Sequence, residues 1–162
     1  MAQFFAIHPD NPQDRLIKQA ADIVRSGGVI VYPTDSCYAL GCKLGDKNAM
    51  ERILTIRKID QKHHLTLMCA DLSELGTYAK VDNAQFRQLK AATPGSYTFI
   101  LQATKEVPNR TLHPKRKTIG LRVPNNATAL ALLQELGEPI LSCTLMLPED
   151  DEPLTDTYDI RD

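Results

Sequence analysis

The chain has 162 residues, of which 43% are hydrophobic and 24% are charged, and its formal net charge at pH 7 is −1. This composition is typical of one soluble globular domain, and the near-neutral charge excludes a general electrostatic attraction to nucleic acid. No apolar run approaches the ~20 residues that a membrane-spanning helix needs. The first residues also lack the basic and apolar regions of a secretory signal. We therefore expect a cytoplasmic protein with no membrane partner.

The predicted helices and strands begin and end at capping and turn residues. Asn11 and Pro12 suit the N-cap and first turn of the first helix, and Gly27 suits its end. Asp46 can cap the second helix and Asp71 the third. Helices are expected near residues 12–26, 46–56, 71–79, 83–92 and 127–136, and strands near residues 29–32, 65–69, 97–101, 118–123 and 139–147.

The order of these elements predicts the fold class. Strands and helices alternate irregularly along the chain. We expect an α/β (α+β) fold in which a twisted, open sheet of mixed parallel and antiparallel strands is flanked by helices. In the helix near residues 83–92, Phe86 and Leu89 are expected to face inward.

The four cysteines form neither a Cys-x-x-Cys motif nor a zinc-ligand spacing with the histidines. In an intracellular protein this pattern favours reduced, buried thiols over disulfides or a metal site, and we predict no metal ligands. The cysteines are Cys37, Cys42, Cys69 and Cys143.

Charge is distributed unevenly near the end of the chain. Residues 105–122 contain six basic residues and one acidic residue, whereas residues 149–162 contain seven acidic residues and one basic residue. The first segment could attract anions, and the second is typical of a solvated tail.

One stretch combines a strand with a polar cluster. Residues 29–32 are β-branched or aromatic and predict a buried strand, which Pro33 must end. Thr34, Asp35 and Ser36 follow directly, and Tyr38 comes shortly after them. Polar groups at the carboxyl end of a strand are typical of a small-molecule site in α/β proteins. The same residues are also favoured in a simple turn between two strands.

The segment from Pro33 to Cys42 resembles the Pro-Thr-(Asp/Glu)-Thr-x-Tyr-Gly-Leu-Gly signature of the YrdC/YciO family. The opening residues 4–11 are similar to the YciO branch in particular. The likeness extends to about residue 148, so we expect a YrdC-like domain over residues 1–148. Family members normally continue through further strands, and we expect residues 149–162 to be a poorly ordered acidic tail.

The best-known members of this family are threonylcarbamoyl-AMP synthases. The resemblance implies that threonine, bicarbonate and ATP with magnesium yield threonylcarbamoyl-AMP and pyrophosphate, for modification of tRNA to threonylcarbamoyladenosine. It also implies that Thr34 and Tyr38 line an amino-acid pocket, that Asp35 orients a loop amide and that Thr98 contacts nucleotide. Arg122 would face the amino-acid carboxylate, although strand alternation alone equally allows it to face solvent.

The resemblance also shows two departures from the synthases. Their Lys-x-Arg-Pro segment corresponds here to Arg57, Lys58 and Ile59, and an apolar Ile59 cannot bind phosphate. Their Ser-x-Asn motif corresponds to Thr144, Leu145 and Met146, and a thioether cannot replace a carboxamide. We therefore expect a paralogue with weak or altered activity and assign no catalytic residue. The candidate substrate- and nucleotide-binding residues are Thr34, Asp35, Tyr38, Arg57, Lys58, Thr98, Arg122, Cys143 and Thr144.

Two other functions are compatible with the sequence. A double-stranded RNA- or tRNA-binding module would use Lys115, Arg116 and Lys117 together with Arg122. A regulatory protein would bind ATP, AMP or a threonine-like molecule without turnover. A basic loop is, however, more often simply solvated, and no aromatic RNA-recognition motif is present.

Overall fold

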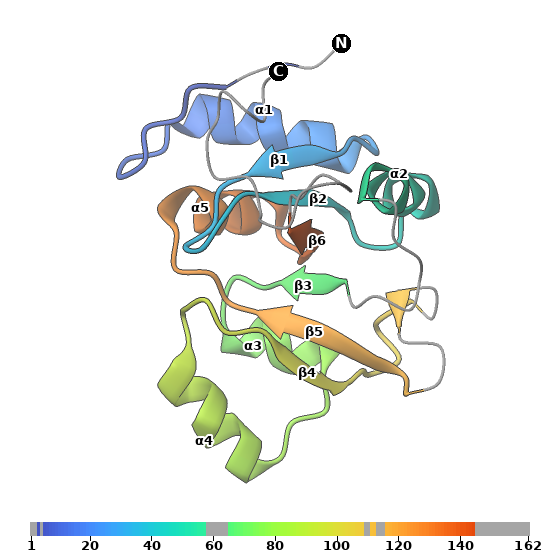
Figure 1. Ribbon diagram of the computed structural model, residues 1–162. Helices are drawn as coiled ribbons and strands as arrows, with labels where there is room; N and C mark the ends of the chain where they lie inside the picture. Colours follow the sequence, from blue (N-terminus) through green and yellow to red (C-terminus); the bar gives the residue numbers. More distant parts are fainter. Residues whose placement is uncertain (1–2, 4, 58–64, 109–110, 113–115, 145–162) are drawn as a thin grey trace.

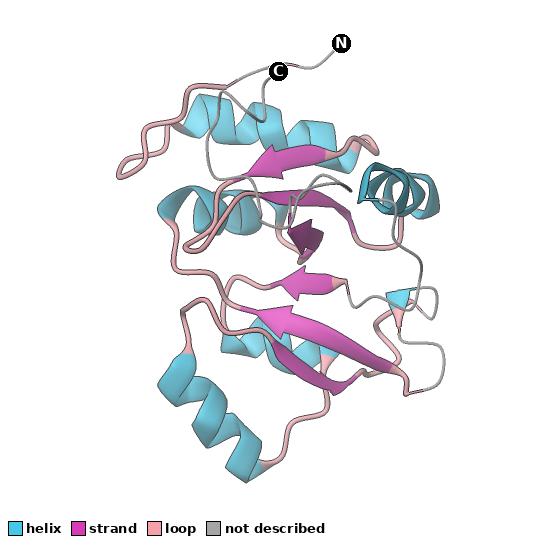
Figure 2. Cartoon of the chain, viewed as in Figure 1, coloured by secondary structure: helices cyan, strands magenta, loops and turns pink. Residues whose placement is uncertain are grey.

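The computed structural model describes residues 3, 5–57, 65–108, 111–112 and 116–144. Five helices and six strands lie in this part of the chain (Figures 1 and 2). The helices are α1 (Asp14–Arg25), α2 (Lys47–Arg57), α3 (Leu72–Tyr78), α4 (Asn83–Ala92) and α5 (Ala127–Leu136). The strands are β1 (Ile30–Tyr32), β2 (Ala39–Lys43), β3 (Thr66–Met68), β4 (Phe99–Gln102), β5 (Thr118–Arg122) and β6 (Ile140–Thr144).

The six strands form a single sheet in the order β1-β2-β6-β3-β5-β4, which runs from top to bottom in Figure 1. β3 and β5 are parallel, and the other neighbouring pairs are antiparallel. The predicted mixed, open sheet flanked by helices is therefore confirmed. β2 was not predicted as a separate element, although the alternative of a turn between two strands implied a strand after the polar cluster.

Each face of the sheet carries its own hydrophobic core. On one face, called the α1/α5 face, Ile17 of α1 and Leu132 of α5 pack with Ile140 of β6. On the opposite face, called the α2/α3/α4 face, side chains from the other three helices pack with Leu121 of β5 and Leu141 of β6. The neighbours Ile140 and Leu141 belong to different cores because successive strand residues point to opposite faces.

The start of α1 differs from the prediction. Its N-cap is Gln13 and not Asn11, and no side chain caps it. The amide of Asn11 instead donates to Nδ1 of His8 at 3.0 Å, in a turn that precedes the helix. Asp46 and Asp71 do cap their helices, since they accept hydrogen bonds from the amides three residues later, at 3.0 and 2.8 Å.

Two segments are less buried than predicted. β1 is an edge strand, and Val31 in it is 42% exposed. In α4, Leu89 is buried as predicted, but Phe86 is 45% exposed, so the prediction for Phe86 is wrong. The space-filling view shows hydrophobic side chains gathered where β4 and α4 lie in Figure 1. α4 thus covers the edge of the sheet with one side only.

Within the described ranges, no helix is long and apolar enough to cross a membrane. The predicted acidic tail at residues 149–162, and with it the end of the domain predicted over residues 1–148, lie outside the described residues.

Candidate functional site

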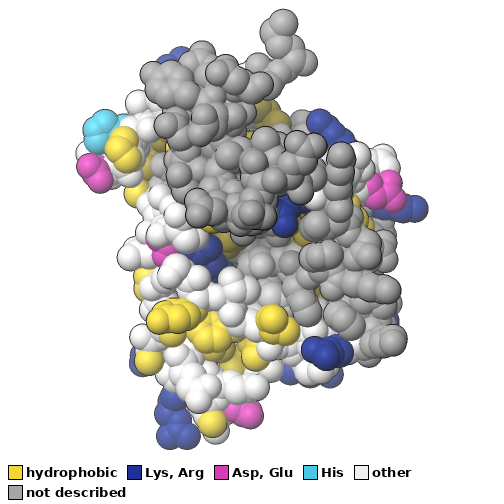
Figure 3. Space-filling model, viewed as in Figure 1, with side chains coloured by type: hydrophobic (Ala, Val, Ile, Leu, Met, Phe, Trp, Pro, Cys, Tyr) yellow, Lys and Arg dark blue, Asp and Glu magenta, His cyan; other side chains and the backbone are white. Residues whose placement is uncertain are grey.

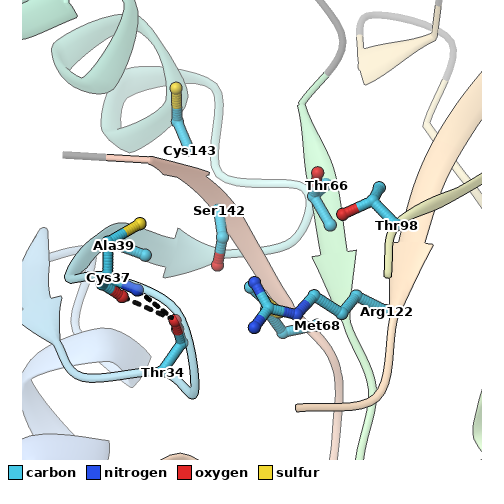
Figure 4. A pocket seen from close by; sticks show the side chains of 9 residues that line it. All are labelled: Thr34, Cys37, Ala39, Thr66, Met68, Thr98, Arg122, Ser142 and Cys143. Carbon is cyan, nitrogen blue, oxygen red and sulfur yellow. Dashed lines mark hydrogen bonds between the residues drawn. The ribbon is translucent and has the colours of Figure 1, made fainter. Parts of the chain in front are cut away.

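A pocket opens on the α1/α5 face of the sheet (Figure 4). Its volume is about 300 Å³ when the open space at its mouth is included. The lining residues come from four strands, from the loop after β1 and from the segment before β4: Thr34, Cys37, Ala39, Thr66, Met68, Thr98, Arg122, Ser142 and Cys143.

Strand pairing explains why these side chains meet. Met68 pairs with Arg122 and Thr66 with Gly120 across β3 and β5, and Thr66 also pairs with Ser142 of β6. Residues that pair directly project their side chains from the same face of a sheet. The three central strands therefore present two hydroxyls, a thioether and a guanidinium side by side.

Arg122 connects two loops at this pocket and is only 6% exposed. Its Nε donates to the carbonyl of Gly95 at 3.1 Å, and Nη1 donates to Ser36 Oγ at 3.3 Å. Nη2 forms an ion pair with the carboxylate of Asp35. These partners are needed because an unpaired buried charge is costly. Of the two predicted orientations, the structure shows the one in which Arg122 faces a pocket.

The role expected for Asp35 needs correction. The carboxylate does not orient a loop amide, as the resemblance implied, but pairs with Arg122 on a different strand. The local sequence could not indicate this contact, since the two residues are 87 positions apart.

Thr34 closes a turn and also lines the pocket. Its Oγ1 donates to the carbonyl of Cys37 at 2.5 Å and accepts from the Cys37 amide at 3.2 Å (Figure 4). It also accepts from the amide of Ser36 at 3.2 Å. Nδ2 of Asn126 donates to the Thr34 carbonyl at 3.4 Å, while Asn126 Oδ1 caps α5. Thr34 is therefore both a turn residue and a pocket residue, so the two alternatives do not exclude each other.

Tyr32 supports the pocket from the core. Its ring lies against Gly41, where an added Cβ atom would come within 2.7 Å of Tyr32 Cε1. Its hydroxyl forms a buried hydrogen bond with Ser142 Oγ. Burial raises the pKa of the Tyr32 phenol well above its usual range, although Ser142 and Arg122 oppose the shift. The phenol is therefore protonated and able to donate to Ser142.

Thr66 and Thr98 form a wall of the pocket beside β5. An added Cβ atom at Gly120 would lie 3.1 Å from Thr98 Cγ2 and 3.2 Å from Thr66 Oγ1. The glycine thus gives both threonines room to approach the strand. Thr98, for which a nucleotide contact was implied, is placed in the same pocket as Arg122.

Cys143 lines the pocket, and Arg57 is the last residue of α2. Burial raises the pKa of the Cys143 thiol, and the positive charge of Arg57 opposes this shift. The backbone of Thr144 pairs with Ala39, and its side chain lies outside the described part of the chain.

Tyr38 does not line this pocket, and its expected place in the amino-acid site stays a prediction. It packs against the core on the α2/α3/α4 face. The next residue, Ala39, lines the pocket, so strand alternation directs Tyr38 to the opposite side. Lys58, together with Ile59 and Met146, lies outside the described residues.

The basic segment before β5 is divided between the surface and the interior. Arg116 and Lys117 are exposed, whereas Arg122 is buried in the pocket. Lys115 is outside the described residues. RNA binding through Lys115, Arg116 and Lys117 stays a prediction, and it loses the contribution of Arg122.

Five lining residues were not among the candidates. Cys37 and Ala39 lie within the motif at residues 33–42, whereas Thr66, Met68 and Ser142, from β3 and β6, belong to no motif. The sequence held a signal for two of them, because Thr66 and Ser142 are hydroxyl residues in predicted strands that are mostly apolar. A polar side chain in a buried strand needs either a partner or a cavity.

The comparisons with known proteins begin with a family model. The Sua5_yciO_yrdC model, described as "Telomere recombination", matches residues 22–162. The chain belongs to the Sua5/YciO/YrdC family. Over its full length it is 65% identical to the uncharacterised protein YciO of Escherichia coli (strain K12), and it spans 79% of that protein. The crystal structure of E. coli YciO matches with a TM-score of 0.96 and 64% identity, over 99% of this chain and 78% of that one.

Two further members of the Sua5/YciO/YrdC family have informative names. A threonylcarbamoyl-AMP synthase of Chromobacterium violaceum is 36% identical over 135 residues, which are 83% of this chain and 69% of that enzyme. The crystal structure of P. abyssi Sua5 complexed with L-threonine matches with a TM-score of 0.76 and 27% identity. That match covers 83% of this chain and 39% of the Sua5 chain. The relationship to threonylcarbamoyl-AMP synthase is thereby established at the level of the family.

Proposed function

We propose that the pocket binds a threonine-like amino acid through Arg122, and that the protein is a threonylcarbamoyl-AMP synthase-like paralogue with weak or altered activity. The observation that carries this proposal is a buried guanidinium in a pocket lined by hydroxyls. The binding of L-threonine by a Sua5 with the same fold supports it, as does the named synthase among the relatives.

The chemistry of the lining suits an amino acid. A guanidinium has five N–H donors, and hydrogen bonds to described residues use three of them. Further donors are thus available for a carboxylate. Thr66 and Thr98 offer hydroxyls to a polar ligand side chain, and Met68 offers an apolar contact.

ATP and AMP, the proposed nucleotide ligands, find fewer matching groups. Phosphate oxygens require fixed cations. Arg57, whose positive charge acts on the pocket residue Cys143, is one candidate among the described residues. Among the described residues, no group of three histidine, cysteine or acidic side chains could hold a metal ion. Magnesium would therefore enter as part of the nucleotide substrate, bound by its phosphates and water. The small number of phosphate-binding groups among the described residues is why we propose slow adenylate formation.

Calorimetry with L-threonine tests the binding step. Wild-type protein should bind L-threonine, and Arg122→Lys should bind it about tenfold or more weakly, since lysine keeps the charge but not the forked donor geometry. Arg116→Lys makes the same exchange at an exposed position and should bind like wild type. Equal affinity in all three proteins would contradict the proposal.

Pyrophosphate release tests the chemical step. With ATP, magnesium, bicarbonate and L-threonine, the proposal predicts a threonine-dependent rate far below that of an authentic threonylcarbamoyl-AMP synthase. Turnover comparable to such an enzyme would reject the assignment as a weak paralogue. Binding of threonine without any pyrophosphate release would indicate a binding protein in place of an enzyme.

A further inference from the structure

The guanidinium of Arg122 is already paired with a carboxylate of the protein, that of Asp35. The side chains of Arg122 and Asp35 are 8% and 15% exposed, respectively, so their ion pair is largely removed from water. Charges in such surroundings interact more strongly and are screened less by salt than charges at the surface. Ser36 and Gly95 also bind the guanidinium, but both contribute neutral groups. Arg122 and Asp35 together therefore carry almost no net charge.

The ion pair with Asp35 determines which negatively charged ligands Arg122 can bind favourably. A ligand with a net negative charge is attracted by Arg122 and repelled by Asp35, so its net electrostatic gain is small. A zwitterionic amino acid carries an ammonium group beside its carboxylate and can place one charge toward each partner. Asp35 Oδ1 contacts Arg122, while Oδ2 has no hydrogen-bond partner among the described residues.

We infer that Asp35 is a specificity-determining residue, which makes this pocket select zwitterionic amino acids over carboxylates that lack an ammonium group. The inference rests on the proposed amino-acid site and adds to it a residue that discriminates by charge. It also leads us to expect weak capture of phosphate groups, since Asp35 neutralises the cation that would otherwise attract them.

The test compares two ligands of similar shape. L-Threonine and 3-hydroxybutyrate share the hydroxyl and the carboxylate, but 3-hydroxybutyrate lacks the ammonium group. In calorimetry, wild-type protein should prefer L-threonine by at least about tenfold. Asp35→Asn should reduce this preference about tenfold or more, chiefly through tighter binding of 3-hydroxybutyrate.

Two control variants separate charge from position. Asp35→Glu keeps the negative charge and should restore the preference. Asp22→Asn removes an equal charge from an exposed ion pair on α1 and should leave the preference unchanged.

The possible results are distinguishable. An undiminished preference in Asp35→Asn would overturn the inference, as would an equal loss of affinity for both ligands, which would show that Asp35 only holds Arg122 in place. If Asp35→Asn fails to fold, wild-type protein that binds both ligands equally would overturn the inference by itself. Failure of wild-type protein to bind L-threonine at all would overturn the proposed function as well.

Discussion

Arg122 occupies an unusual position for a charged residue, at the end of a strand whose five residues are all buried. A guanidinium there is stable only if its charge and donors are satisfied. Asp35, Ser36 and Gly95 provide these contacts from two separate loops. The requirement for partners thus fixes the positions of both loops around the pocket, and the structure of the site follows from this one residue.

Ser142 has its position fixed in a similar way by Tyr32. We predict that Tyr32→Phe lowers the free energy of unfolding by about 1 kcal/mol, because it removes a buried hydrogen bond. Ser142 keeps its bond to the Ile140 carbonyl, so the loss should be limited. Urea denaturation measures the change. Tyr97→Phe, at an exposed tyrosine, should be nearly neutral, and equal stabilities for both variants would contradict the prediction.

Four of the candidate binding residues line one pocket, namely Thr34, Thr98, Arg122 and Cys143. Tyr38 does not line it, and strand alternation could be applied to Tyr38 only once β2 was recognised as a strand. Contacts that depend on distant segments, such as the ion pair of Arg122, leave no local pattern and could not be predicted.

At the scale of elements, β2 is the strand that the sequence did not predict as a separate element. Its residues are Ala39–Lys43, and alanine, glycine and lysine are depleted in strands. Pairing with β1 on one side and β6 on the other forms the strand despite this composition. Tertiary pairing therefore outweighs local preference at this position.

Gly41 of β2 makes the close approach of Tyr32 possible. We predict that Gly41→Ala destabilises the protein by roughly 1–3 kcal/mol, the usual cost of forcing extra atoms into a packed core. The new Cβ atom would lie 2.7 Å from both Ile140 Cγ2 and Tyr32 Cε1. Gly76→Ala is the matched control, because nothing lies within 4 Å of its Cβ position in helix α3. It should be neutral or slightly stabilising, and thermal unfolding in which Gly41→Ala matches it would contradict the prediction.

At the scale of the whole molecule, one carboxyl group makes stability depend on pH. It belongs to Glu74 of α3, and its charged form is unfavourable in the folded protein. Burial raises the pKa of Glu74, and repulsion from Asp71 and Glu138 adds to this, while a hydrogen bond from the Ala70 amide opposes it. The folded protein therefore binds this proton more tightly than the unfolded chain does. Stability from this group is present below the ordinary carboxyl range and is lost as pH rises through the elevated pKa.

Glu74→Gln should remove this dependence. Glutamine keeps an acceptor for the Ala70 amide but cannot ionise, so the variant should lose less stability than wild type as pH rises above about 4.5. Urea denaturation over a series of pH values measures the difference between the two proteins. Glu51→Gln, at an exposed position on α2, serves as the control. A pH dependence of stability identical to that of wild type would contradict the account.

The fold class followed from the sequence, but the topology did not. Irregular alternation of helices and strands was sufficient to predict a mixed sheet flanked by helices. The order β1-β2-β6-β3-β5-β4 places β6, the last strand in the described part of the chain, in the interior of the sheet. Such an order depends on long-range pairing, which hydrophobic periodicity within each element does not encode.

The central claim is that one pocket, built around Arg122, binds an amino acid. The most direct test is a titration of isotope-labelled protein with L-threonine, followed by the chemical shifts of its backbone amides. The account predicts saturable shifts centred on residues 34–37 and on Thr66, Thr98, Arg122 and Ser142. Saturable shifts centred elsewhere, for example around Arg116 and Lys117, or no shifts at all, would contradict it.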